Sequence, residues 1–136
     1  MVGEYHLGEF VNRFRRGSLS MHVAESGVSQ LPMLLYGTVN GVLGVVAQLP
    51  QEDFTFFNKL QEQLRGVILG VGGLKHSEWR SFQNDRKTVD AHNFVDGDLI
   101  EAYLDLSPEK MAGVAEMMEV SVEELSNRVR DLERLH

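Results

Sequence analysis

Cysteine is absent from the chain of 136 residues, and this absence excludes disulfide bonds and metal sites built on thiolates. Long hydrophobic runs are also absent, because no stretch reaches the roughly 18 apolar residues that a membrane-spanning helix needs. The first residues form neither a basic segment nor an apolar one, so we expect no secretory signal. These absences favour a protein of the nucleus or the cytoplasm that has no membrane partner.

Acidic residues outnumber basic ones, and the imbalance lies in one part of the chain. Residues 1–50 and residues 51–95 each contain equal numbers of acidic and basic side chains. Residues 96–136 contain eleven acidic and four basic residues, and so carry the whole net charge of -7. An acidic segment repels phosphate, which argues against a nucleic-acid surface there and favours a solvated acidic helix face. The hydrophobic share of 43% is typical of one globular domain and argues against disorder.

The first fifty residues have the pattern of β-strands. Residues 18–23 alternate between apolar and polar side chains, which predicts a half-buried strand. Residues 4–7 and 10–14 show a similar but weaker pattern. Residues 25–30 are polar and contain a glycine, so we expect a loop there.

Asn40 and Gly41 separate two β-rich runs, residues 33–39 and residues 42–47. Both residue types tolerate a positive φ, so this dipeptide between two such runs predicts a β-hairpin. The apolar runs are nearly continuous, which predicts that the hairpin is covered on both faces.

A helical period replaces the strand period after Pro50. Apolar residues recur at spacings of three and four from Phe54 to Val71, which predicts a helix about five turns long. Gly66 and Gly70 lie four residues apart on this helix, and we expect them to allow close packing of another element. The dipeptide at 72–73 consists of two glycines and is expected to end the helix.

Three helices are predicted to close the chain. The first begins near Asp96 or Asp98, because either carboxylate can cap the first backbone amides of a helix. The second begins at residues 107–108, where a serine precedes a proline. The third begins at Ser121, with Glu124 three residues later, which is the spacing of a capping box.

Residues 75–82 form a short segment with the chain's one tryptophan. The polar composition of residues 83–93 predicts a loop there. The expected fold class is therefore α+β, with antiparallel strands first and a small helical domain after a boundary near Pro50.

Motifs for chemistry are missing or have a structural explanation. Residues 66–73 lack the spacing of a phosphate-binding loop, and the five histidines lack the spacing of a metal site. Asp96, Asp98 and Glu101 could serve acid–base chemistry or bind Mg²⁺, but acids at a helix start also cap backbone amides. We find no support for an enzyme, and we expect no cofactor and no metal.

Two groups of residues are candidates for binding. Trp79, Arg80 and Phe82 are of the types that dominate protein interfaces, although a buried tryptophan at the junction of sheet and helices also explains Trp79. Arg13, Arg15 and Arg16 are interleaved with aromatic residues, which is compatible with nucleic-acid binding. On a strand, however, alternation places Arg13 and Arg15 on one face and Phe14 on the other, which is typical of a half-exposed strand.

Several stretches of the chain resemble one known family. These stretches are residues 3–12, 36–41, 76–82, 94–101 and 132–136. They are similar to the C-terminal end of the large subunit of the UV-damaged-DNA-binding protein, the adaptor of cullin-4 ubiquitin ligases. Residues 10–15 and 49–52 give the resemblance a plant character. The Asp-Gly-Asp-Leu run is less specific, because the large propeller subunits of splicing factor 3b and of the cleavage and polyadenylation factor contain similar versions.

The resemblance implies a fold of three β-propellers followed by a helical domain. Residues 1–49 would be the last strands of a partial propeller, and residues 50–136 would be the helical C-terminal domain. The resemblance also implies a nuclear protein-interaction role in ubiquitination and the DNA damage response. Its partners would be substrate receptors and the remaining propellers of the adaptor, with DNA reached through the complex.

The chain departs from the family by lacking the cullin-docking propeller, so we expect no direct contact with cullin. Two other interpretations stay open. The first is that the chain is a nucleic-acid-binding or RNA-processing subunit. The second is that it is a truncated product without an independent function.

Overall fold

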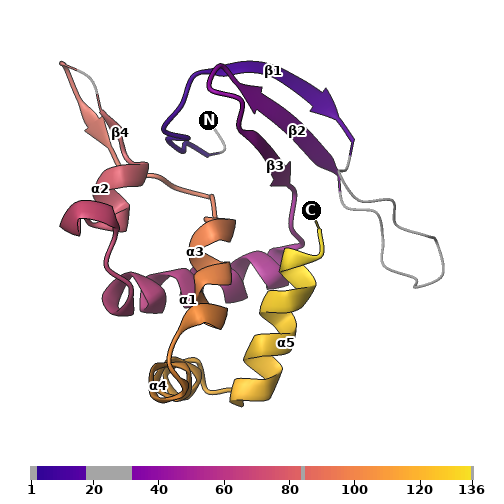
Figure 1. The fold of residues 1–136 in the computed structure, drawn as a ribbon, viewed down its shortest axis with the longest axis vertical. Helices are drawn as coiled ribbons and strands as arrows, with labels where there is room; N and C mark the ends of the chain where they lie inside the picture. The colour runs from indigo at the N-terminus through magenta and orange to yellow at the C-terminus, as the bar shows by residue number, and fades with distance from the viewer. Residues whose placement is uncertain (1–2, 18–31, 84, 136) are drawn as a thin grey trace.

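The computed structural model of the chain describes residues 3–17, 32–83 and 85–135. A three-stranded sheet and a group of helices lie on opposite sides of the molecule (Figure 1). The elements, in order, are β1 Val11–Arg16, β2 Met33–Thr38, β3 Leu43–Ala47, α1 Gln51–Val67, η1 Val71–Gly73, α2 His76–Arg80, β4 Phe82–Gln83, β5 Thr88–Val89, α3 Gly97–Glu101, η2 Ala102–Asp105, α4 Pro108–Met118 and α5 Val122–Glu133. The strand predicted over 18–23 and the loop over 25–30 lie outside the described residues.

The sheet has the strand order β1-β2-β3, with both neighbouring pairs antiparallel. The hairpin predicted at residues 40–41 is confirmed, because the backbone N–H of Thr38 donates to the carbonyl of Val42 at 2.9 Å. Of the turn residues 39–41, only Gly41 has a positive φ, at 89°, which fits a three-residue loop that ends on a left-handed residue. Local turn chemistry therefore sets the register between β2 and β3.

The hairpin is not covered on both faces, contrary to the expectation from its continuous apolar runs. None of the residues in β2 and β3 is fully buried, and the side chain of Leu43 is 70% exposed. One face of the sheet meets the N-terminal segment across an open apolar pocket of about 240 Å³. The pocket is lined by Tyr5, Leu7, Phe14, Leu34, Val46 and Phe94. On β1, every residue except Val11 is exposed.

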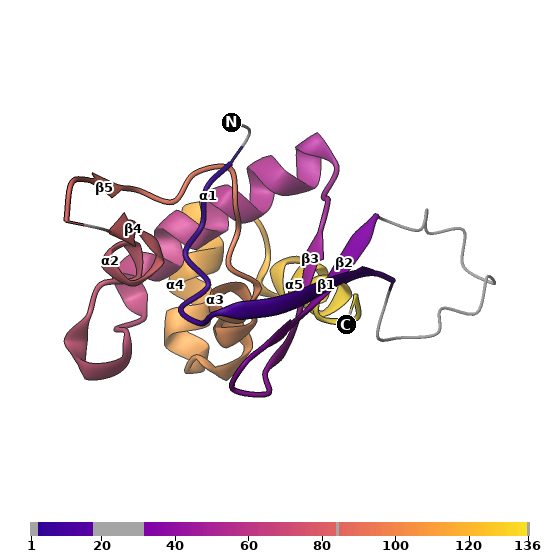
Figure 2. The same ribbon diagram turned by 90° about the horizontal axis from the view of Figure 1, so that it is seen from above.

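The helical side contains the hydrophobic core. α1, α3, α4 and α5 pack together with η2 (Figure 2). Residues of the apolar stripes predicted from the sequence are buried between them. The core residues are Phe57, Leu60, Leu64, Leu99, Ile100, Tyr103, Val114, Ala115, Met118, Leu125 and Val129. Because these residues come from four α-helices and the 3-10 helix η2, the helical part has a core of its own.

The starts of the last two helices agree with the sequence. Pro108 is the first residue of α4, although the Ser107 side chain makes no capping hydrogen bond. The backbone N–H of Glu124 donates to the Ser121 hydroxyl at 3.1 Å, which is the serine half of the capping box predicted for α5. A cap of this kind stabilises a helix by about 1 kcal/mol.

The predicted end of the long helix was wrong. α1 ends at Val67, and Ile68 is already extended, with φ −103° and ψ 119°. A Cβ at Gly66 would meet nothing within 4 Å, and one at Gly70 would meet only the carbonyl of Leu74 in the following turn. These two glycines therefore do not admit another element, and the apolar residues after Val67 belong to a connecting turn.

The loop predicted over residues 83–93 contains a short strand instead. β4 pairs with β5 through Phe82 with Val89 and through Gln83 with Thr88. Two-residue strands carry too little periodicity to be read from a sequence. No helix in the described part of the chain is long and apolar enough to cross a membrane.

Two leucines allow a matched test of the helical core. Leu60 is 0% exposed in the core, whereas Leu69 is 89% exposed in the turn after α1. We expect Leu60→Ala to lower the free energy of unfolding by about 2–5 kcal/mol, because it leaves a cavity. Leu69→Ala should change it by less than about 0.5 kcal/mol. Chemical denaturation measured by circular dichroism checks both, and equal losses for the two variants would contradict this packing.

Candidate protein-interaction site

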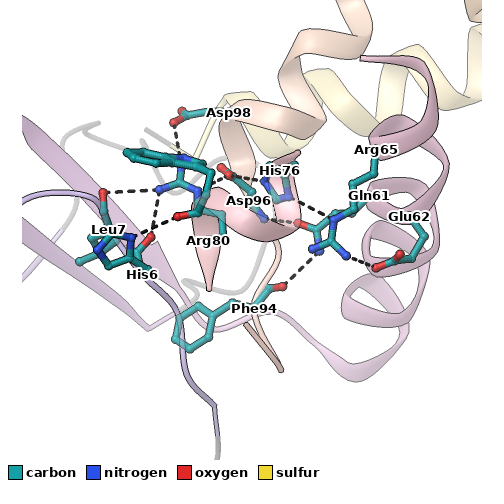
Figure 3. A network of polar contacts seen from close by, with 11 residues as sticks. His6, Leu7, Gln61, Glu62, Arg65, His76, Arg80, Phe94, Asp96 and Asp98 are labelled. Atoms are coloured by element: carbon teal, nitrogen blue, oxygen red, sulfur yellow. Dashed lines mark hydrogen bonds and ion pairs between the residues drawn. The ribbon is translucent and has the colours of Figure 1, made fainter. Parts of the chain in front are cut away.

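Arg80 lies at the centre of a buried polar network (Figure 3). Arg80 is the last residue of the five-residue helix α2 and is only 8% exposed. Its Nε–H donates to Oδ2 of Asp96 at 2.6 Å, and Nε2 of His76 lies 2.7 Å from the same oxygen. His76 and Arg80 are four residues apart, so one face of α2 presents both to Asp96. A single carboxylate oxygen therefore binds two side chains of one helix.

The tautomer of His76 follows from its second neighbour. Nε of Arg65, on α1, donates to Nδ1 of His76 at 3.1 Å. Because an arginine Nε–H can only donate, Nδ1 is the acceptor and the ring proton lies on Nε2. The His76 ring thus accepts a hydrogen bond from Arg65 at Nδ1 and donates one to Asp96 from Nε2.

Gln61 holds the backbone on which Asp96 sits. The backbone N–H of Asp96 donates to Oε1 of Gln61 at 2.7 Å, and Nε2 of Gln61 donates to the carbonyl of Phe94 at 3.4 Å. The Gln61 side chain is buried on α1. One amide therefore fixes the extended segment that leads into α3 and aims the Asp96 carboxylate at α2.

The capping role predicted for Asp96 was wrong. Asp96 does occupy the N-cap position of α3, but its side chain makes no capping hydrogen bond because it binds Arg80 and His76. Asp98 is in the first turn of α3, with its carboxylate exposed and 3.8 Å from Nη2 of Arg80. Among the described residues no group of three or more His, Cys, Asp or Glu side chains could hold a metal ion.

The network changes the acidity of two groups. Burial alone would raise the pKa of the Asp96 carboxyl, but the hydrogen bonds from His76 and Arg80 and the charge of Arg80 outweigh burial and hold that pKa well below its usual range. Burial and the Asp96 charge raise the pKa of the Tyr5 phenol well above its usual range. Tyr5 therefore stays protonated beside an ionised Asp96, as a donor beside an acceptor.

The N-terminal segment is attached to this network. Nη1 of Arg80 donates to the carbonyls of His6 and Leu7 at 3.2 and 3.4 Å. The backbone N–H of His6 returns a hydrogen bond to the carbonyl of Arg80 at 3.2 Å. The guanidinium also lies 4.8 Å from the ring centroid of Tyr5. Arg80 thus connects the segment before β1 to the segment between α2 and α3.

Trp79 lies beside the network and is not the buried anchor that one interpretation predicted. It is 44% exposed. A Cβ at Gly8, whose φ is +85°, would lie 2.3 Å from Cη2 of the indole, so only glycine leaves room for the ring. The His6 ring meets the indole edge-on, with 5.9 Å between centroids. Trp79 is therefore a half-exposed aromatic side chain held in a fixed position.

The other candidate residues lie apart from Arg80. Phe82 contributes backbone pairing in β4, and its side chain lies outside what the structure describes. Arg13, Arg15 and Arg16 are exposed on β1. Directly opposed residues share a face of a sheet, and Phe14 is opposite Tyr36, with 6.1 Å between their rings. This agrees with the predicted alternation of Phe14 and its neighbouring arginines.

Sequence reasoning missed that Tyr5, Gln61, His76 and Asp96 belong to one network with Arg80. The one local signal is the spacing of His76 and Arg80, which places them on the same helix face. Nothing in the sequence pairs that face with a carboxylate sixteen residues beyond Arg80.

Comparisons with known proteins cover the whole site. The CPSF A subunit region family matches residues 1–105. The chain is 60% identical over 136 residues to DNA damage-binding protein 1a of Arabidopsis thaliana and to DNA damage-binding protein 1 of Solanum lycopersicum. It is 39% identical over 145 residues to DNA damage-binding protein 1 of Drosophila melanogaster.

These matches span 100% of this chain but 12% of the length of the two plant relatives. The match to the Drosophila protein spans 99% of this chain and 13% of the length of that relative. The resemblance seen in the sequence is confirmed by them, including its plant character.

The buried carboxylate predicts a specific dependence of stability on pH. We expect Asp96→Asn to lower the free energy of unfolding at pH 7 by about 3–5 kcal/mol, because Arg80 loses its ion pair. The folded carboxyl has a lowered pKa, so the stability it supplies is complete above the unfolded pKa of about 4 and is lost as pH falls below it. The difference in free energy of unfolding between the unchanged chain and Asp96→Asn should therefore become smaller as the pH falls from about 5 to 2.

Denaturation at a series of pH values checks this dependence. Asp105→Asn is the matched control, because Asp105 is exposed. It should leave stability nearly unchanged at every pH. If the difference in free energy of unfolding between Asp96→Asn and the unchanged chain stays the same down to about pH 2, the ion pair is contradicted.

Proposed function

Because the chain belongs to the CPSF A subunit region family, we propose that it is a non-catalytic protein-interaction segment of a cullin-4 ubiquitin ligase adaptor. The observation that carries this proposal is the 60% sequence identity, over the whole chain, to plant proteins named DNA damage-binding protein 1a and DNA damage-binding protein 1. In this role the chain contributes to substrate-receptor recruitment, protein ubiquitination and the DNA damage response in the nucleus.

The proposed organisation has two parts. Residues 1–49 form the terminal strands of a partial β-propeller, and residues 50–136 form the helical C-terminal domain. The open antiparallel sheet and the separate helical core are compatible with this division. The contacts of Arg80 with His6 and Leu7 then connect the two parts.

Trp79, Arg80 and Phe82 form the proposed partner-binding site. Tryptophan supplies much contact area at a small cost in conformational entropy, and exposed tryptophans are frequent hot spots. Gly8 and His6 already hold the indole in place, so binding needs little further ordering. Arg80 is buried and acts as a positioning residue behind Trp79, with its guanidinium 5.1 Å from the indole centroid.

Reconstitution of the adaptor tests this site. The partner is purified Arabidopsis relative from which the matching region has been removed, alone or together with a cullin-4 substrate receptor. We expect the chain to bind one of these, and Trp79→Ala to weaken binding by at least about tenfold, as hot-spot truncations do. Isothermal titration calorimetry with the folded variants measures both affinities.

Met117→Ala is the matched control, because Met117 on α4 is 45% exposed and Trp79 is 44% exposed. It should bind as the unchanged chain does. If neither the truncated adaptor nor the receptor binds the chain, the interaction role is lost. If both variants weaken binding equally, Trp79 has no special part in it.

A further inference from the structure

Two carboxylates share one guanidinium beside Trp79. The guanidinium of Arg80 lies 5.1 Å from the indole centroid. Asp96 meets Nε of Arg80 at 2.6 Å, and Asp98 meets Nη2 of the same residue at 3.8 Å (Figure 3). Both carboxylates are negative at neutral pH, whereas Arg80 supplies one positive charge. This group therefore carries one negative charge that Arg80 does not compensate.

The charged groups on the neighbouring helices do not supply the missing positive charge. The His76 ring has its one proton on Nε2, because Nδ1 accepts from Arg65, so the ring is uncharged. Arg65 forms an ion pair with Glu62 on α1. At the start of α2, Oε2 of Glu78 accepts from the backbone N–H of Lys75 at 3.3 Å, so these two residues bring opposite charges close together. The excess negative charge beside Trp79 thus remains.

Asp98 is the carboxylate that presents this charge to solvent. Its side chain is 94% exposed, whereas the side chain of Asp96 is 6% exposed. The contact of Asp98 with Arg80 is also much longer than that of Asp96. An exposed pair of this kind contributes little to stability, because water screens it. Asp98 can therefore pair with a group from outside the chain at small cost.

The groups around Asp98 are suited to a cation. The indole of Trp79 attracts cations to its face more strongly than other aromatic rings do, and 44% of the residue is exposed. The exposed His6 also borders the ring. Its Nδ1 donates to the carbonyl of Trp79 at 3.1 Å, since a carbonyl can only accept, so Nε2 of the neutral ring is an acceptor.

We propose that Trp79 receives a positively charged side chain of the partner, which stacks on the indole and pairs with Asp98. This inference rests on the proposed partner-binding site and adds the chemistry of the residue that occupies it. An arginine can do both at once, because its planar guanidinium stacks on aromatic rings and forms paired hydrogen bonds with a carboxylate. A negatively charged side chain would be repelled by Asp98, and an apolar one would cover the carboxylate without pairing it.

The reconstituted complex tests the charge of the partner residue. The chain and its variants Asp98→Asn, Trp79→Ala and the combination of both are titrated into the truncated Arabidopsis relative, alone or with the substrate receptor. Isothermal titration calorimetry is carried out at about 50 mM and about 500 mM salt, because salt screens exposed charges. Asp105→Asn is the matched control, since it makes the same chemical change at an exposed position of η2.

We expect Asp98→Asn to weaken binding by at least about fivefold at low salt and by less at high salt. The combined variant should bind about as weakly as Trp79→Ala alone, because both residues hold the same partner side chain. Asp105→Asn should bind as the unchanged chain does. Circular dichroism verifies that each variant is folded before it is titrated.

A second measurement uses the full chain without a protein partner. Trp79 is the one tryptophan of the sequence, so its indole N–H gives a single signal in a ¹⁵N nuclear magnetic resonance spectrum. The probes are three capped tripeptides of glycine, a central residue and glycine, in which the central residue is arginine, citrulline or glutamate. We expect the arginine peptide to shift the indole signal most, at roughly millimolar concentration. Asp98→Asn should remove the difference between the arginine and citrulline peptides.

The two measurements separate this inference from the proposed function. Equal affinities of Asp98→Asn and the unchanged chain, or equal shifts with arginine and citrulline, would overturn the inference, whereas a loss of binding in Trp79→Ala would still support the partner site. Additive losses in the combined variant would show that Asp98 acts at another contact. A larger shift with glutamate would assign the site to an anion. If no partner binds the unchanged chain, the proposed function falls and the peptide titration alone decides the charge preference.

Discussion

The carboxylate of Asp96 and the guanidinium of Arg80 are both removed from water, and the chain must surround them with partners to keep them there. Each buried charge is expensive unless it is paired and hydrogen-bonded. Asp96 satisfies this requirement with Arg80, His76 and the Tyr5 hydroxyl. Arg80 satisfies it with Asp96 and with the carbonyls of His6 and Leu7. The relative positions of the N-terminal segment, α1, α2 and α3 follow from this pair (Figure 3).

The parts of the fold with strong local signals could be predicted from the sequence. The starts of α4 and α5 are set by a proline and by a serine cap, and the β2–β3 hairpin is set by a glycine turn. The end of α1 could not be predicted, because the apolar spacing continues past Val67 while the backbone becomes extended at Ile68. Periodicity shows which residues are apolar, and it does not show where the helix leaves the core.

The candidate site depends on contacts between distant residues, and there the sequence was a poor guide. Asp96 has the local context of a helix cap, but its partners are sixteen and twenty residues away. Trp79 is of a residue type that is found both in cores and at interfaces, and only the approach of Gly8 shows that the ring is held at the surface. The exposed sheet has a similar explanation in the proposed function. That proposal treats the sheet as part of a larger propeller, and the chain spans 12% of the length of the two plant relatives.

The central claim is that the Arg80–Asp96 pair holds the N-terminal segment against the helical part. Amide hydrogen exchange of Arg80→Leu, followed residue by residue, tests this most directly. We predict much faster exchange at the N–H groups of Glu4 and His6, which bond to His92 and Arg80 across the junction, and unchanged protection at Val129 in the core. Unchanged protection of Glu4 and His6 would show that the segment is held by other contacts, and would contradict the claim.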